Sequence, residues 1–125
     1  MPIDATRPYD ESNIFARILR GELPCNKVYE DEHALAFHDI NSQAPVHILV
    51  IPKGAYVSWD DFSSRASEAE IAGFVRAVGH VARVAELVEP GYRLLANTGM
   101  NSGQEVPHLH VHVFGGRGLG PMLAR

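Results

Sequence analysis

Three histidines occupy alternate positions near the end of the chain: His108, His110 and His112. Alternate side chains of a β-strand point to the same face, so these imidazoles would stand in a row, about 6–7 Å apart. The residues between them are apolar and would point into a core. Imidazole can transfer protons, attack phosphorus or carbon, or bind a metal near neutral pH. The row therefore indicates catalysis or metal binding.

Metal binding is the first alternative to consider. A His-x-His pair on a strand can hold zinc, but the outer two histidines of a straight strand lie about 13 Å apart, so another ligand must come from elsewhere. His33, His38 and His47 are not at spacings typical of zinc sites, and Cys25 is the single cysteine. We therefore expect neither a metal nor another cofactor. The alternative is a metal-dependent hydrolase, and activity that a chelator abolishes would favour it.

The segment before the histidines, residues 97–107, is rich in glycine, asparagine and serine. Such residues form tight turns with exposed backbone N–H groups, which can surround an anion. Asn97 and Gln104 add amide donors, whereas lysine and arginine are absent from the segment. The composition is also typical of an ordinary loop. It favours phosphate binding because it leads directly to the histidines.

The pattern His-φ-His-φ-His-φ-φ resembles the signature of the histidine triad (HIT) family. Matching segments follow in unbroken order over roughly residues 12 to 123: Asn13–Phe15, Leu23–Pro24, Ala36–Ile40, Gln43–His47, Val50–Lys53 and Gly115–Arg117. These segments resemble the Hint-type branch, which comprises purine nucleoside phosphoramidases, and the ending Gly118–Leu123 resembles its bacterial members.

The resemblance implies catalytic roles for four histidines. His110 would attack the phosphorus of a purine nucleoside 5′-phosphoramidate and form a nucleotidyl-histidine, which water then cleaves. His112 would polarise a phosphate oxygen, and His108 would help to place the phosphate and the leaving group. His47 would orient the nucleophilic imidazole. Nearby imidazoles are also expected to help keep His110 unprotonated.

The resemblance also implies a nucleotide-binding cleft. Asp39 would accept hydrogen bonds from the ribose diol. The purine would lie in an apolar cleft formed by Ile14, Phe15, Ile18, Leu23 and Phe37. Further substrate contacts are expected from Ile40, Asn97, Gly103, Gln104, Glu105 and Val106.

Three positions depart from the family pattern. Glu105 stands where many eukaryotic relatives have a serine that can donate to the leaving group, although bacterial-looking members often carry glutamate. Ala55 replaces the histidine usually found in Pro-Lys-x-His, and the tail lacks a tryptophan that some relatives present to the neighbouring subunit. The leaving-group preference is therefore expected to differ.

The expected activity is hydrolysis of the phosphorus–nitrogen bond of these phosphoramidates, including aminoacyl-adenylate types. One alternative is hydrolysis of dinucleoside polyphosphates. Another is a nucleotide-binding or scaffold protein whose catalysis is incidental. Replacing His110 distinguishes an enzyme from a binding protein, because an enzyme would lose turnover while nucleotide binding survives.

Composition narrows the class of protein. The 125 residues are 46% hydrophobic and 21% charged, with a formal net charge of -4, which is typical of one globular domain. The chain has no basic cluster and no apolar run of membrane-spanning length, so we expect neither nucleic acid nor membrane as a partner. A single cysteine and no apolar signal region favour a cytoplasmic protein.

The elements that position the histidines can be outlined from periodicity. Residues 1–11 are expected to be a flexible arm, and residues 12–125 a single HIT domain. Ser12 or Asn13 could cap a short helix, and Ser67 with Glu70 has capping-box spacing for a long one. Strands are expected near residues 27–30, 34–39, 46–51, 92–97 and 108–114, and a loop over 53–66. The fold class is α+β, with about five antiparallel strands, one short N-terminal helix and one long helix. The resemblance further implies a homodimer with a ten-stranded sheet.

Overall fold

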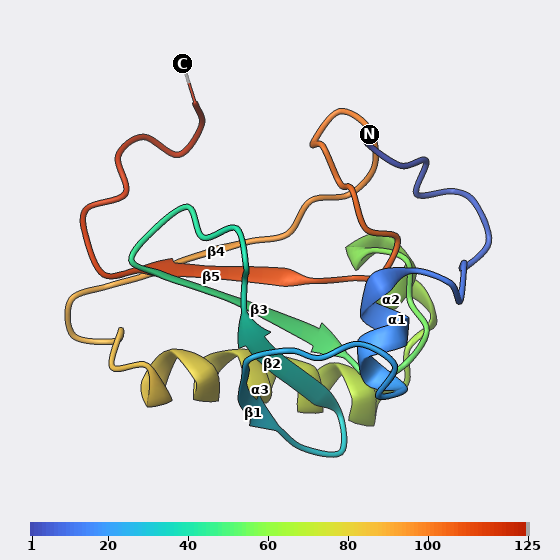
Figure 1. Cartoon of the computed structure of the whole chain (residues 1–125), viewed down its shortest axis with the longest axis horizontal. Helices are drawn as coiled ribbons and strands as arrows, with labels where there is room; N and C mark the ends of the chain where they lie inside the picture. The colour runs from blue at the N-terminus through green and yellow to red at the C-terminus, as the bar shows by residue number, and fades with distance from the viewer. Residues whose placement is uncertain (125) are drawn as a thin grey trace.

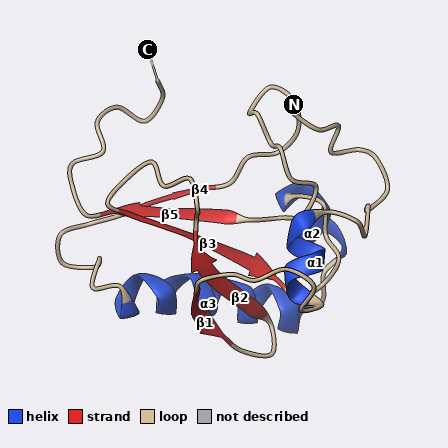
Figure 2. Ribbon diagram, in the orientation of Figure 1, coloured by secondary structure: helices blue, strands red, loops and turns tan. Residues whose placement is uncertain are grey.

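A five-stranded antiparallel sheet forms the centre of the computed structural model, which describes residues 1–124 (Figure 2). The strands are β1 (Lys27–Glu30), β2 (Ala34–His38), β3 (Val46–Pro52), β4 (Arg93–Leu95) and β5 (Val111–Gly115), in the order β1-β2-β3-β5-β4. The helices are α1 (Ile14–Leu19), α2 (Trp59–Arg65) and α3 (Glu68–Val84). The α+β class, with a short and a long helix, is confirmed. Arg125, the last residue of the expected domain, lies outside the described residues.

The register of the sheet sorts its side chains onto two faces. In the pairing of β3 with β5, Leu49 is opposite His112 and Ile48 is opposite Val113. Directly opposed residues of antiparallel strands share a face, and successive residues alternate between faces. One face therefore carries His47, Leu49 and His112, whereas the other carries Ile48 and Val113.

Helix α3 covers the second face (Figure 1). It begins with the expected capping box, in which the Ser67 and Glu70 side chains and backbone N–H groups bond reciprocally. Its buried residues are Phe74, Ala77, Val78, Val81 and Ala82. They pack on a core that includes Ile48, Val50, Leu109, Val111 and Val113, as the alternation in the histidine stretch indicates. This layer forms the larger core, and the face with His47 and His112 lies on the other side of the sheet.

Helix α1 packs on the first face, where it forms one wall beside the histidines. Asn13 caps the helix by accepting a hydrogen bond from the Ala16 N–H, 2.9 Å away. Gly21 follows the helix at a φ of 78°, a conformation that glycine adopts without strain. Phe15 is buried against Phe37 of β2, with ring centroids 5.6 Å apart.

Two elements differ from the expectations. The segment 53–66 is not all loop, because Ser58 caps α2 and two aspartates lie in the first turn of that helix. Strand β5 begins at Val111, so His108 and His110 lie in the segment before it rather than in a straight strand. The chain bends at residues 106–108, before β5, and the three histidines therefore have different surroundings.

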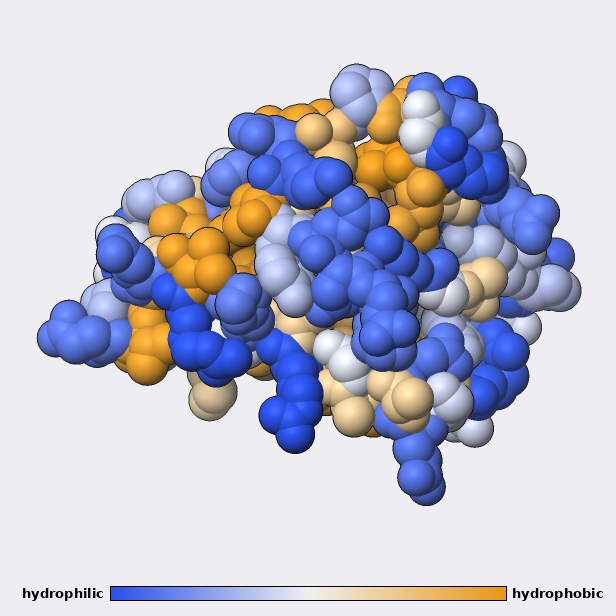
Figure 3. Space-filling view, turned by 90° about the horizontal axis from the view of Figure 1, so that it is seen from below, coloured by the Kyte–Doolittle hydropathy of each residue, from blue (hydrophilic) through white to orange (hydrophobic). Residues whose placement is uncertain are grey.

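Hydrophobic residues also reach the surface on the side of the molecule that carries α3 (Figure 3). A groove of about 610 Å³ there lies between α3 and β4. Half-exposed apolar side chains line it: Trp59, Val75, Tyr92 and Leu94. Among residues 1–124, none of the helices combines the length and the apolar character needed to cross a membrane.

Candidate active site

A cleft of about 620 Å³ opens on the face of the sheet that carries the histidines. The residues expected to bind substrate that line it are Ile14, Phe15, Ile18, Leu23, Phe37, Asp39, Ile40, Asn97, Gly103, Glu105 and Val106. His110 and His112 lie in the same lining. Segments distant in the sequence, from α1, β2, β5 and the loop after β4, thus meet around two imidazoles.

His110 is held in one tautomer by the main chain. Its Nδ1 lies 2.8 Å from the His108 carbonyl oxygen, which can only accept, so Nδ1 carries the proton. Nε2 of the neutral ring therefore keeps its lone pair. Every buried side-chain nitrogen and oxygen of the described residues has a hydrogen-bond partner, so Nε2, which bonds to none of them, reaches the cleft. An oriented, unprotonated ring nitrogen in a substrate-sized cleft is suited to nucleophilic attack.

His112 receives its orientation from His47, a buried residue of β3. The Gln43 backbone N–H donates to Nδ1 of His47 at 3.1 Å, so the proton of a neutral His47 ring is on Nε2. That Nε2 lies 2.9 Å from Nδ1 of His112 and 3.3 Å from Oδ2 of Asp39. When His47 donates to His112, the proton of His112 is on its own Nε2. His112 is then a donor to an oxygen in the cleft.

Phe114 supports the His47–His112 pair from the next position on the same face of β5. The His112 and Phe114 rings are stacked, with centroids 5.5 Å apart and an interplanar angle of 1°. The centroids of the His47 and Phe114 rings lie 4.3 Å apart. This residue was not foreseen as part of the site, although its alternation with the histidines indicated the shared face.

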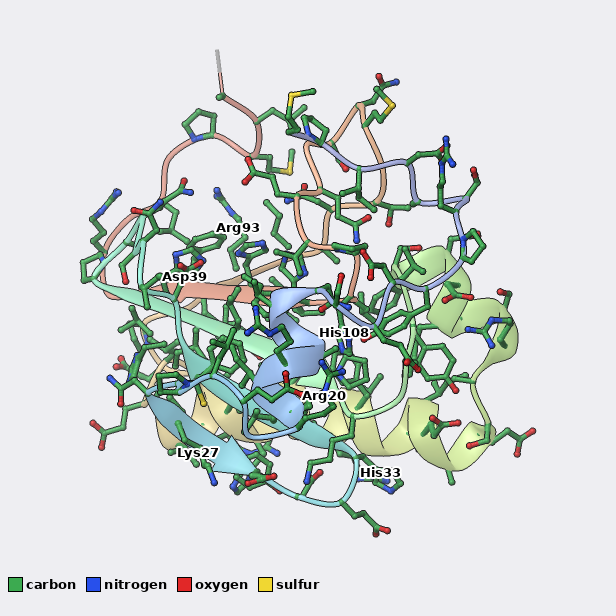
Figure 4. All side chains as sticks on the ribbon, turned by 45° about the vertical axis from the view of Figure 1, so that its right-hand side comes forward. Arg20, Lys27, His33, Asp39, Arg93 and His108 are labelled. Carbon is green, nitrogen blue, oxygen red and sulfur yellow. The ribbon has the colours of Figure 1, made fainter. Side chains whose placement is uncertain are left out.

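His108, for which the resemblance implies a role in placing the phosphate and the leaving group, does not line the cleft. Its ring is fully buried, Nε2 lies 2.8 Å from the Pro52 carbonyl oxygen, and Nδ1 lies 2.5 Å from the Tyr9 hydroxyl. Both ring nitrogens are therefore occupied by protein groups. Figure 4 labels His108 and Asp39 on opposite sides of α1.

Gln104 is likewise absent from the cleft lining. Its amide nitrogen donates to the Val57 and Val106 carbonyl oxygens at 2.7 and 3.0 Å. Its amide oxygen accepts from the Gly99 N–H at 2.9 Å. The residue is 1% exposed, and these hydrogen bonds hold the loop together.

Burial lowers the pKa of all four histidines that the family resemblance implies to be catalytic. Loss of hydration lowers the pKa of His110 and of His47, and nearby Asp39 acts in the opposite direction on both. The same cause lowers the pKa of His108 and of His112 to about 4, with the positive charge of His110 as a further contribution. For His110 the main cause is therefore burial rather than the neighbouring imidazoles.

The charge of the cleft is unusual for a site that would bind phosphate. Its lining contains Asp39 and Glu105 but neither lysine nor arginine. A bound phosphate would be stabilised by imidazole, main-chain N–H and side-chain amide groups, without a fixed cation. Asp39 already has partners, because its carboxylate accepts from the Asn41 N–H at 2.8 Å and lies beside His47.

Asp39, His47 and His112 could also hold a metal ion. Each offers one ligand atom, and the three atoms lie within 4.8 Å of one another. The contacts between these residues already account for the arrangement, because the acceptor and donor nitrogens of His47 are matched to its neighbours. A metal would have to replace the proton between His47 and His112.

Comparison with known proteins gives consistent matches over the whole domain. A family model described as HIT domain matches residues 20–119. An uncharacterized 13.2 kDa HIT-like protein from Azospirillum brasilense is 71% identical over 119 residues, covering 95% of this chain and 98% of the relative. The purine nucleoside phosphoramidase of Escherichia coli strain K12 is 43% identical over 114 residues, covering 91% and 95%. A histidine triad protein from Clostridium difficile superposes with a TM-score of 0.80 at 37% identity, covering 91% of this chain and 98% of that one.

Proposed function

The chain belongs to the HIT family, and from that premise we propose that it hydrolyses the phosphorus–nitrogen bond of purine nucleoside 5′-phosphoramidates. The observation that carries the proposal concerns His110, whose Nδ1 lies 2.8 Å from the His108 carbonyl oxygen. Its Nδ1–H donates to the His108 carbonyl, and the Nε2 lone pair is left for the cleft. The 43% identical relative named purine nucleoside phosphoramidase supports the choice of substrate class.

In the first step, Nε2 of His110 forms a bond to phosphorus while the bond from phosphorus to the amine nitrogen breaks. The amine takes up a proton from solvent and leaves, and the imidazole of His110, now bonded to phosphorus, becomes positively charged. Its Nδ1–H already donates to the His108 carbonyl, which stabilises that charge. Nε2–H of His112 would donate to a phosphoryl oxygen and offset the charge that develops there.

In the second step, water attacks phosphorus and gives up a proton to solvent as the bond to His110 breaks, which releases the nucleoside monophosphate and restores the neutral imidazole. Splitting one displacement into two is the advantage of a covalent intermediate. The base would lie among Ile14, Phe15 and Phe37, and Asp39 would accept from the ribose hydroxyls.

The charge of the cleft favours phosphoramidates over dinucleoside polyphosphates. Each additional phosphate brings a negative charge, and the lining offers two carboxylates and no fixed cation to meet it. A phosphoramidate of a nucleoside monophosphate carries a single phosphorus and fits this balance better.

The test compares adenosine 5′-phosphoramidate with diadenosine tetraphosphate, in the presence of a chelator. We expect chelator-resistant release of AMP from the phosphoramidate by the wild type, and loss of turnover with retained AMP binding in His110→Ala. His80→Ala is the matched control, because His80 is an exposed histidine of α3 away from the cleft. Turnover of neither nucleotide by the wild type contradicts the proposal.

A metal-dependent hydrolase is the second candidate, and the cluster of Asp39, His47 and His112 favours it. It predicts that a chelator abolishes activity and that a stoichiometric metal co-purifies with the protein. Activity that survives chelation, together with a metal-free preparation, would exclude it.

We further propose that the protein is a homodimer that pairs through the groove between α3 and β4. Half-exposed Trp59, Val75, Tyr92 and Leu94 form an apolar surface that a second copy would bury, as the family resemblance implies. Sedimentation should give the mass of a dimer for the wild type and of a monomer for Val75→Glu. A monomeric wild type at micromolar concentration would contradict this assembly.

A further inference from the structure

The N-terminal segment, expected to be a loose arm, lies against the loop that leads to the histidines (Figure 1). The Ile3 N–H donates to the Gln104 carbonyl oxygen at 2.7 Å, which ties the start of the chain to that loop. Further along, the Arg20 guanidinium donates to the Glu11 carbonyl oxygen at 2.9 Å. The segment between these two attachments contains Tyr9.

Tyr9 reaches the first histidine of the triad from 99 positions away in the sequence. Its hydroxyl is 2.5 Å from Nδ1 of His108, and the two rings meet edge to face with centroids 5.6 Å apart. The side chain is half-buried, and burial raises the pKa of Tyr9, with a hydrogen bond from Asn13 acting in the opposite direction. The hydroxyl therefore retains its proton near pH 7 and can donate it.

The direction of this hydrogen bond follows from the other side of the His108 ring. Nε2 faces the Pro52 carbonyl oxygen at 2.8 Å, which accepts only, so Nε2 carries the proton of the neutral ring. Nδ1 is then an acceptor, and Tyr9 is the donor. A buried acceptor that loses its donor has a free-energy cost, so the Tyr9 hydroxyl helps to hold the ring in place.

His108 in turn holds the nucleophile. Its carbonyl oxygen receives Nδ1–H of His110 at 2.8 Å, and that bond sets the direction in which Nε2 of His110 points. Neither Tyr9 nor His108 lies in the cleft lining, so neither is placed to contact substrate. A continuous path of contacts therefore runs from the N-terminal segment to the reacting nitrogen.

We propose that Tyr9 is a positioning residue: its hydroxyl fixes the His108 ring, and His108 fixes the carbonyl that aims Nε2 of His110 at phosphorus. The inference rests on the proposed function, because the reaction it serves is the phosphoramidase reaction. It assigns residues 1–11 to the catalytic apparatus rather than to a flexible appendage. Imprecise aim of the nucleophile lowers the rate of the chemical step more than the affinity for substrate.

The experiment compares Tyr9→Phe with the wild type on adenosine 5′-phosphoramidate, measuring kcat and KM separately. Phenylalanine keeps the ring contact with His108 and removes only the hydroxyl. Tyr29→Phe is the matched control, because its hydroxyl donates to Asp31 at 2.8 Å and its ring packs against His80 of α3, outside the cleft lining. For Tyr9→Phe we expect kcat to fall about fivefold to tenfold, which corresponds to one lost hydrogen bond, and KM to change less than twofold.

The second measurement is the ¹⁵N resonance of the His108 ring in the wild type and in Tyr9→Phe. In the wild type, Nε2 should be protonated and Nδ1 should show the shift of a hydrogen-bonded acceptor. In Tyr9→Phe, Nδ1 should move toward the shift of a free acceptor. An unchanged Nδ1 resonance would show that Tyr9 does not donate to His108 and would overturn the role of Tyr9.

The outcomes separate this inference from the proposed function. A wild type without phosphoramidase turnover overturns the proposed function, whatever the variants do. An active wild type with an unchanged kcat in Tyr9→Phe, or an equal loss in Tyr29→Phe, overturns the role of Tyr9. Protonation of Nδ1 in wild-type His108 also overturns it, and that result does not require the variant to fold.

Discussion

The buried His108 should make the protein less stable in mild acid. Its pKa is lowered to about 4 in the folded protein because the ring is removed from water, whereas an unfolded chain has the ordinary value of about 6.5. The lowered pKa means that the unfolded chain binds the proton more readily. Stability is therefore complete above about pH 6.5 and is lost as the pH falls toward 4.

The size of the effect follows from the two pKa values. At pH 5 the unfolded ring is almost fully protonated and the folded ring is almost neutral, which shifts the folding equilibrium about 30-fold against the folded state. This corresponds to about 2 kcal/mol of unfolding free energy lost between pH 7 and pH 5 through His108 alone. His112 acts in the same direction, but its ring is partly exposed, so we discount its contribution.

The assay is urea unfolding at pH 7, 6 and 5, followed by the fluorescence of Trp59, the single tryptophan. His108→Gln has no titrating group at this position, and its amide can still donate to the Pro52 carbonyl. The wild type should lose about 2 kcal/mol more than this variant between pH 7 and 5. His80→Gln controls for the loss of one histidine. Equal losses in the wild type and His108→Gln would refute the reasoning, whatever their absolute stabilities.

Three further predictions concern the pH dependence of kcat/KM, the stability that Gln104 gives its loop, and the leaving-group preference at Glu105. Because burial lowers the pKa of His110 and its neutral ring is the proposed nucleophile, kcat/KM should stay level as the pH falls past 6.5, and an acid limb centred at or above 6.5 would contradict this. Gln104→Leu leaves two carbonyls and one N–H without partners and should cost about 2–3 kcal/mol in urea unfolding; an unchanged midpoint would exclude the structural role. Glu105→Gln should reduce the kcat/KM preference for phosphoramidates with a positively charged leaving group over neutral ones by up to about fivefold, and an unaltered ratio would show that Glu105 does not face that group.

Local signals were sufficient to predict the main elements of the fold. The Asn13 cap and the capping box of Ser67 and Glu70 depend on residues within one helical turn, and both are present in the structure. Alternation in the histidine stretch separated the core side chains from the site side chains. The helix α2 was missed although Ser58 and the following aspartates form a start signal, because no apolar stripe accompanies them.

The surroundings of each imidazole could not be predicted in the same way. His108 shares the spacing of its neighbours, yet its partners are Tyr9 and the Pro52 carbonyl, 99 and 56 positions away. Only the three-dimensional fold shows that its ring nitrogens are already occupied. Gln104 is similar, because its partner Val57 is 47 positions away. Residue type and spacing predicted which groups form the site, but tertiary contacts decide which of them line the cleft.

The groups that fix the imidazole tautomers belong largely to the main chain: the Gln43 N–H for His47, the Pro52 carbonyl for His108 and the His108 carbonyl for His110. Main-chain groups do not change when side chains are exchanged. The cleft wall formed by α1 and the residue at position 105 can therefore vary without moving Nε2 of His110. In this architecture the choice of substrate and the chemical step can evolve, or be redesigned, independently of each other.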